Sequence, residues 1–201
     1  MSGSPSAGLG RPREFDTDEA LERAMQVFWA RGYDGTSLTD LTGAMGITRS
    51  SMYAAFGNKE QIFRKAVQRY AEGPASYATR ALREPTARAV AEAFLRGAVR
   101  TTTSPGRPAG CLSVQGALAL SEHSRPAHDT LAGWRIDAGE QLEGRFRRAV
   151  EEGDLPRDTD PGRLARYVMT TAFGIAVQAA NGLGPDTLDE IAETALLAWP
   201  T

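Results

Sequence analysis

The sequence has little of what would indicate a secreted, membrane-spanning or disulfide-bonded protein. A single cysteine, Cys111, among 201 residues excludes an internal disulfide framework and is typical of a reducing cytoplasm. No apolar run approaches the roughly 20 residues that a bilayer-spanning helix needs. The first residues, MSGSPSAGLGRPREF, lack the apolar segment of a secretory signal. We therefore expect a cytoplasmic protein that does not bind a membrane.

Groupings of side chains that would indicate an enzyme or a metal site are also lacking. We find no nucleophile–base pair, no glycine-rich phosphate loop and no metal-ligand spacing. His123 and His128 are separated by five positions around Pro126, so they do not share a helical face. The flanks of Cys111, GCLSVQGAL, are small and apolar, with no basic residue to activate the thiol. We expect no catalytic activity, no cofactor, no metal and a buried, inert cysteine.

An excess of one sign of charge is absent too. The formal net charge is -2, and a hydrophobic content of 41% with 24% charged residues is ordinary for a globular protein. Residues 1–70 hold 9 basic and 8 acidic residues, a net +1, and residues 71–201 hold 14 and 17, a net -3. Any basic surface must therefore be local, because the whole chain does not attract a polyanion.

Signals for helices recur along the chain, whereas signals for strands are nearly absent. Helix starts are predicted at Asp16 with Glu19, Ser37 with Asp40, Thr48, Asn58 with Gln61, Asp160 before Pro161, and Thr187 with Glu190. Gly32, Gly46 and the pair Gly73-Pro74 are predicted to end helices. Longer helices are expected at about 86–102, 110–121, 126–152 and 161–181. The sequence predicts an all-α fold, in which an N-terminal three-helix domain precedes a larger C-terminal helical bundle.

The segment from Ser37 to Phe56 has the spacing of two short helices joined by a tight turn. On a helical wheel Met52 and Phe56 point inward together, and Ser50 lies on the opposite side. Arg49 is nearer the inward side by ideal angle, but its length lets the guanidinium reach solvent. From this pattern alone, a plain helical hairpin that packs on the first helix remains an equal alternative to a surface that touches a groove.

The residues from Ala24 to Phe63 closely resemble the N-terminal domain of TetR-type transcriptional regulators. The matching positions are Phe28, Gly32, Tyr33, Thr36, Ser37, Leu41, Ala44, Gly46, Ile47, Met52, Tyr53, Phe56, Asn58, Lys59, Glu60 and Phe63. The resemblance extends loosely over the rest of the chain. It implies a disordered basic arm at 1–14, a helix-turn-helix DNA-binding domain at 15–58, and a helical ligand-binding and dimerisation domain at 59–201.

The resemblance also implies which side chains contact double-stranded DNA. The recognition helix covers about Thr48 to Ala55, and the expected contacts are Thr48, Arg49, Ser50 and Tyr53 from this helix, Ser37 and Lys59 from the neighbouring helix starts, and Arg11 and Arg13 from the arm. Relatives often have aromatic or polar residues where this chain has Ala54 and Ala55. Ala54 could still meet a thymine methyl group, and Ala55 is expected to pack inward. Arg11 and Arg13 either enter a minor groove or belong to a solvated tail.

The family's second domain implies a homodimer and a small-molecule effector. Ala165, Ala172, Ala176 and Ala179 would permit close approach of helices, and Leu188, Ile191, Leu196 and Trp199 form an apolar stripe; both sets could instead close the core of one monomer. The candidate effector-binding residues are Phe94, Cys111, Gln115, Trp134 and Phe173, each of which could equally be ordinary core.

The expected function is therefore a ligand-responsive repressor that binds an inverted-repeat operator as a homodimer and is released by a small hydrophobic effector. The alternatives are a helical interaction module, an activator without small-molecule induction, or a thiol-based sensor through Cys111. Positions matched to phosphates, such as Lys59, favour the regulator over the interaction module.

Overall fold

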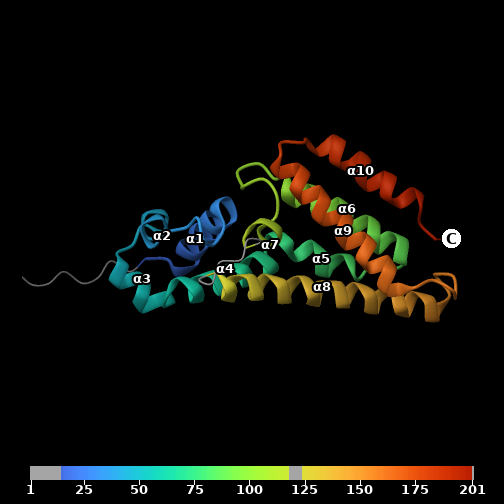
Figure 1. Cartoon of the computed structure of the whole chain (residues 1–201), viewed down its shortest axis with the longest axis horizontal. Coiled ribbons are helices and arrows are strands. Elements are labelled where there is room, and N and C mark those ends of the chain that lie inside the picture. The colour runs from blue at the N-terminus through green and yellow to red at the C-terminus, as the bar shows by residue number, and fades with distance from the viewer. Residues whose placement is uncertain (1–14, 118–123, 201) are drawn as a thin grey trace, which may run out of the picture.

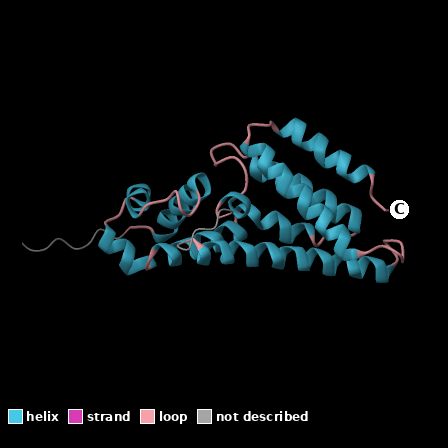
Figure 2. Ribbon diagram, viewed as in Figure 1, coloured by secondary structure: helices cyan, strands magenta, loops and turns pink. Residues whose placement is uncertain are grey.

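The computed structural model describes residues 15–117 and 124–200, and within these ranges every regular element is a helix (Figures 1 and 2). The elements are α1 (Thr17–Arg31), α2 (Leu38–Met45), α3 (Arg49–Phe56), α4 (Lys59–Glu72), the short 3₁₀ helix η1 (Pro74–Ser76), α5 (Tyr77–Ala81), α6 (Ala87–Thr102), α7 (Leu112–Gln115), α8 (Arg125–Glu152), α9 (Pro161–Ala180) and α10 (Pro185–Leu197). Helices α2 and α3 lie at one end of the molecule and the C-terminus at the other (Figure 1). None of these helices is both long and apolar enough to cross a membrane. The predicted all-α fold is confirmed.

The N-terminal helices begin where the sequence predicted, because at each start a side chain accepts a hydrogen bond from a backbone N–H that has no partner within the helix. Asp16, Ser37, Thr48 and Asn58 are the N-caps of α1, α2, α3 and α4. Reciprocal capping boxes occur at the starts of α2 and α4. Four helix starts within about 45 residues are therefore encoded locally, and they fix the lengths of the helices that carry the candidate site.

Two apolar clusters form the core. One joins α1, α2, α3 and α4 to α7 and the first turns of α8, and its largest fully buried side chains include Trp29, Phe28 and Phe63. The other is built from α5, α6, α8, α9 and α10 around Phe146 and Leu95. Helices α4 and α8 pack against each other. The N-terminal helices thus share one apolar cluster with α7 and the start of α8.

Two predicted helices of the C-terminal part have other bounds in the structure, and one helix was not predicted. The last helix starts at Pro185 after Gly184, and the prediction of a cap at Thr187 is wrong because a proline in the first turn already suits a helix start. The helix expected at 110–121 is only Leu112–Gln115 within the described residues, and 118–121 lie outside them. Helix α5 was not predicted. The boundary between residues 58 and 59 stays a prediction, as do residues 1–14, which lie outside the described part.

The residues that the sequence offered for dimer contacts belong to the core of one protomer. Ala165, Ala172, Ala176 and Ala179 are buried, as are Leu188, Leu196 and Trp199, and Ile191 packs against the same cluster. Their periodicity marks the inner faces of α9 and α10, since a helix that covers a core needs such a stripe whether or not it also dimerises. The apolar side chains left exposed on these two helices are Tyr167, Val177 and Leu197.

Candidate nucleic-acid interface

Helix α3 presents a small, polar face to solvent and is anchored by two apolar side chains. Met52 is fully buried and Phe56 is 6% exposed, so both fix the helix against the first cluster. Arg49 and Ser50 are exposed, and Tyr53 is 46% exposed. Within residues 15–117 and 124–200, Arg49 forms no ion pair. A long cation is therefore free to reach a partner from the first turn of this helix.

The hydroxyl groups at the front of α3 form their own small network. The Thr48 side chain accepts a hydrogen bond from the Ser51 N–H at 3.2 Å. Its Oγ1 lies 2.9 Å from the hydroxyls of both Ser50 and Ser51. These bonds satisfy the cap and leave the helix start close to the surface, because none of the side chains is bulky. Such a start can approach the floor of a groove or a phosphate oxygen.

The turn between α2 and α3 depends on one glycine. Gly46 has a φ of 69° and ψ of 28°, a left-handed conformation that L residues rarely adopt. The Ile47 N–H then donates to the Thr42 carbonyl at 3.2 Å, which closes the end of α2. The predicted need for a glycine at this turn is confirmed, and the turn sets the angle at which α3 leaves α2.

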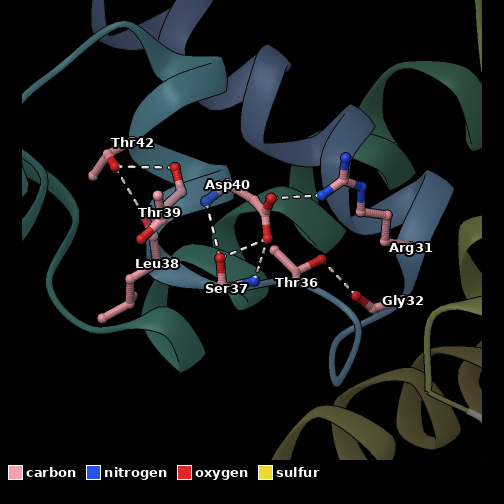
Figure 3. A network of polar contacts seen from close by, with 8 residues as sticks. All are labelled: Arg31, Gly32, Thr36, Ser37, Leu38, Thr39, Asp40 and Thr42. Atoms are coloured by element: carbon pink, nitrogen blue, oxygen red, sulfur yellow. Dashed lines mark hydrogen bonds and ion pairs between the residues drawn. The ribbon is translucent and has the colours of Figure 1, made fainter.

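The start of α2 holds a compact polar network (Figure 3). The Ser37 hydroxyl donates to the Asp40 carboxylate at 2.6 Å, and the Asp40 N–H donates back to that hydroxyl at 3.0 Å. Arg31 from α1 adds an ion pair to Asp40 at 2.6 Å. The hydrogen bonds from Ser37, ahead of the charge of Arg31, hold the pKa of Asp40 below its ordinary value. The hydroxyl proton of Ser37 is thus already engaged within the protein.

A neighbouring hydroxyl is better placed for an external partner. Thr39 is exposed in the first turn of α2, and its side chain makes no hydrogen bond to the described residues. The backbone N–H groups of Leu38 and Thr39 in this first turn also lack partners inside the helix, whereas that of Asp40 donates to Ser37. Sequence reasoning selected Ser37, which stays a predicted phosphate contact, and did not consider that Thr39 has the hydroxyl without a partner in the described residues. The capping box could have indicated this, because a serine that caps a helix uses its hydroxyl there.

At the start of α4, Lys59 lies against an aromatic ring. Its Nζ is 4.2 Å from the centroid of the Tyr33 ring, a cation–π contact. Partial burial lowers the pKa of Lys59 from its ordinary value, and the nearby charge of Asp34 opposes this shift. The first turn of α4 is capped by Asn58 and Gln61. Lys59 therefore carries its charge at the surface of a well-ordered helix start.

The C-terminal end of α3 has contacts that the sequence did not reveal. Lys65 of α4 donates to the Ala55 carbonyl at 3.4 Å and lies 5.4 Å from the centroid of the Phe56 ring. A cation at this end suits the helix dipole. Phe15 packs against Phe56 with ring centroids 6.2 Å apart. Ala55 itself is exposed, so the expectation that it packs inward is wrong. The next residue, Phe56, is the one that faces the core.

Two adjoining chambers lie inside the helical bundle. The inner chamber, of about 20 Å³, is lined by residues of α5, α6, α8 and α9 and by the segment around α7. The outer chamber, of about 130 Å³, lies between the end of α4, η1, α5 and α8. Phe94, Trp134 and Ala138 line both chambers. Of the five candidate effector-binding residues, Phe94, Cys111, Trp134 and Phe173 line the inner chamber.

The fifth candidate, Gln115, lines neither chamber. Its side chain lies against Gly110, where a Cβ atom would come within 2.3 Å of Gln115 Oε1. That oxygen is buried and has no hydrogen-bond partner in the described part of the chain. Cys111 is 7% exposed; its sulfur accepts a hydrogen bond from the Tyr70 hydroxyl at 3.1 Å and lies 3.0 Å from the Ser113 hydroxyl. Arg135 of α8 donates to the Ser113 carbonyl, so a cation does lie near this cysteine although none is near in sequence.

Comparison with known proteins decides the family. Residues 20–66 match the family model for bacterial regulatory proteins of the tetR family, and residues 86–196 match the tetracyclin repressor-like C-terminal domain. The chain is 32% identical to the HTH-type transcriptional repressor ComR of Escherichia coli, over 95% of this chain and 92% of that protein. The chain belongs to the TetR family. It is therefore a DNA-binding transcriptional regulator of that family, whose members are generally not enzymes.

Two further relatives, each aligned with nearly all of this TetR-family chain, support the assignment. The uncharacterised HTH-type regulator YezE of Bacillus subtilis is 33% identical over 94% of this chain and 98% of that protein. A solved structure of a cysteine variant of the TetR family regulator CifR, complexed with 26-bp operator DNA, shares 43% identity, covers 95% of this chain and 100% of its own, and has a TM-score of 0.90. The helix-turn-helix read from the sequence is thus the α2–α3 pair.

Proposed function

We propose that this chain is a ligand-responsive repressor that binds a palindromic operator as a homodimer and is released by a small hydrophobic effector. The exposed face of α3, anchored from beneath by Met52 and Phe56, carries this proposal. A short helix whose outer face holds one long cation and small hydroxyl side chains fits the major groove of B-DNA. The complex of CifR with operator DNA, a relative that is 43% identical, supports the same use of this chain.

The contacts with DNA divide into base reading and phosphate holding. Arg49 is the cation of α3 that can reach a guanine edge, and Ser50 and Thr48 lie beside it. Tyr53 and Lys59 flank the helix and are assigned to phosphates. At the start of α2, Ser37 was the sequence-based assignment; the exposed Thr39 hydroxyl and the free N–H groups of that turn are better donors, because the Ser37 hydroxyl already donates to Asp40.

Homodimer formation is assigned to the outer faces of α9 and α10. Tyr167 is 42% exposed, Val177 45% and Leu197 84%, so these faces retain apolar side chains after the protomer core is complete. A groove of about 410 Å³ between the two helices is lined by residues of both. We assign the exposed apolar side chains of these two helices to the contact with a second copy. A two-fold dimer would set its recognition helices about 34–36 Å apart, one turn of DNA, or a multiple of it.

The two chambers limit the size of the effector. An engineered apolar cavity of about 150 Å³ holds a benzene molecule, and the outer chamber, at about 130 Å³, is of that order. Most residues that line the two chambers are apolar or aromatic; the polar residues of the outer chamber are Thr79, Asp137 and Gln141, and all three are exposed to solvent. We assign the site to a neutral effector from the cytoplasm, with about the size of a single six-membered ring. A thiol-based sensor through Cys111 has less support, because the residue is only 7% exposed and a buried thiol is poorly accessible to oxidants.

A selection of random duplex DNA with the purified protein tests the regulator function. We expect enrichment of a short inverted repeat with strong dependence on salt. Arg49→Ala should then cost about 1–3 kcal/mol at one base position, whereas Tyr53→Ala should weaken binding to all sequences by similar factors and leave the dimer intact. A library from which no palindrome emerges would contradict the regulator function and favour an interaction module.

A further inference from the structure

The contact between Lys59 and Tyr33 gives a role to an aromatic residue that does not itself face solvent. Tyr33 is 9% exposed, and the Lys59 ammonium lies 4.2 Å from the centroid of its ring. We propose that Tyr33 is a positioning residue, whose ring holds the Lys59 ammonium where it meets a DNA phosphate. This inference rests on the proposed DNA-binding function, and it adds a residue that neither the helix-turn-helix pattern nor the exposed surface would select.

The Tyr33 ring is fixed by aromatic neighbours. It stacks on Phe28 with centroids 6.1 Å apart and meets the edge of Phe63 at 5.1 Å. Both neighbours are fully buried in the first cluster. Because Phe28 and Phe63 hold the ring in place, the Tyr33 ring does not move with the lysine, and the position of the ammonium is set by the ring. The long side chain of Lys59, which would otherwise sample many rotamers, is thereby confined before DNA arrives.

The Tyr33 backbone is fixed as well. Its N–H donates to the Gly116 carbonyl at 2.8 Å, and its carbonyl accepts from the Thr36 N–H at 3.2 Å. The preceding residue, Gly32, has a φ of 68°, and a Cβ there would lie 3.3 Å from the Gly116 oxygen. Main chain and ring are therefore set by different neighbours, and the place of the Lys59 charge is determined by the protein's own packing.

Two carboxylates belong to the surroundings of the contact between Lys59 and Tyr33. Asp34, next to Tyr33, attracts Lys59, and Glu60, next to Lys59, adds negative charge to the environment of Tyr33. Carboxylates alone would draw the ammonium toward themselves and away from a phosphate. The face of an aromatic ring attracts a cation without neutralising it. A lysine on a ring thus keeps a full charge to offer to DNA.

Salt titrations of DNA binding test this role. Wild type, Tyr33→Phe, Tyr33→Leu, Lys59→Met and the double variant Tyr33→Leu with Lys59→Met would be titrated onto the duplex enriched by the wild type. We expect Lys59→Met to reduce the slope of log K against log salt by about 0.9 for each DNA phosphate that the lysine neutralises in the wild type. Tyr33→Phe should keep the wild-type slope. Tyr33→Leu should weaken binding about two- to thirtyfold, and the double variant should bind no more weakly than Lys59→Met.

Independent losses in the double variant, or a slope that Tyr33→Leu leaves unchanged, would overturn the inference while leaving DNA binding in place. A wild type that enriches no duplex overturns the proposed function and this inference together. If Tyr33→Leu does not fold, pentafluorophenylalanine incorporated at position 33 keeps the ring's shape and reverses the charge on its face. Compared with Tyr33→Phe, it should reduce the salt slope, and equal slopes for these two proteins would overturn the inference.

Discussion

Replacing Phe94 by alanine tests whether the two chambers are the effector site. Phe94 is 4% exposed, lines both chambers and meets the Tyr77 ring edge-on at 5.7 Å. Removing a buried phenylalanine side chain costs about 3–5 kcal/mol. Because empty space already adjoins Phe94, we expect the lower end, about 3 kcal/mol. For a chain of this length that corresponds to a fall in Tm of about 6–12 °C.

Phe146→Ala is the matched control. Phe146 is fully buried, meets the Trp199 ring at 5.6 Å and lines neither chamber. We expect the free energy of unfolding to fall by about 5 kcal/mol, because Phe146 adjoins neither chamber and the substitution leaves a new cavity. Toluene at a hundredfold excess over its Kd would return about 2.7 kcal/mol to a protein that binds it in the native state. It should therefore raise the Tm of the Phe94→Ala protein well above any gain in the Phe146→Ala protein.

Melting curves followed by circular dichroism, at one protein concentration, measure both effects. A loss of less than about 1 kcal/mol for Phe94→Ala would show that this side chain is not packed as a wall of the two chambers. Equal rescue of both variants by toluene would show general solvation of the core instead of binding at this site. Either result would refute the assignment of the chambers to a ring-sized effector.

Two further predictions concern the cap of α2 and the dimer. Asp40 has a depressed pKa in the folded protein, so its stabilising effect is present above the unfolded value of 3.8 and is lost as the pH falls through the lower folded value. Asp40→Asn should thus lower the Tm at pH 7, and the difference from wild type should narrow below about pH 4; a difference independent of pH would contradict this. Leu197→Glu should shift sedimentation velocity profiles toward monomer and weaken operator binding, whereas Ile136→Glu, on the exposed face of α8, should leave the dimer intact. Persistence of the dimer in Leu197→Glu would exclude this end of α10 from the interface.

Features of the fold that depend on neighbouring residues could be predicted from the sequence. The capping pairs at Ser37 and Asn58 act within four positions, so the starts of α2 and α4 were predictable. The start of α10 was not, because Gly184-Pro185 and Thr187 are competing local signals. The short α7 depends on distant partners. The Trp29 ring N–H donates to the Gly110 carbonyl and the Tyr33 N–H to the Gly116 carbonyl, and these bonds hold the segment in a conformation that its own residues do not encode.

The candidate site was predictable to the same extent. The inward anchors Met52 and Phe56 follow from helical periodicity, whereas the recognition helix followed from the resemblance to TetR-type regulators; the exposed Arg49 was expected. Contacts across the fold were not predictable: Lys59 over Tyr33, Lys65 at the end of α3, and Arg135 beside the segment of Cys111. The apolar stripes of α9 and α10 show a related limit. Periodicity identifies an apolar face, but it does not tell whether that face covers the protomer core or a second copy.

The composition of α3 determines how an operator would be recognised. Ala54 and Ala55 are both exposed, so two of the five exposed residues of α3 have side chains that make no hydrogen bonds to bases. Arg49 remains as the long donor, and the hydroxyls beside it are partly engaged with one another. The groups that the protein fixes in advance, Lys59 on its ring and the capped starts of α2 and α4, are the ones that we assign to phosphates. A protein with few base contacts and several fixed phosphate contacts discriminates sequences by how easily their backbones adopt the required spacing. Substitutions in an operator should therefore matter at flexible steps between the half-sites as well as at the base pair that we propose Arg49 contacts.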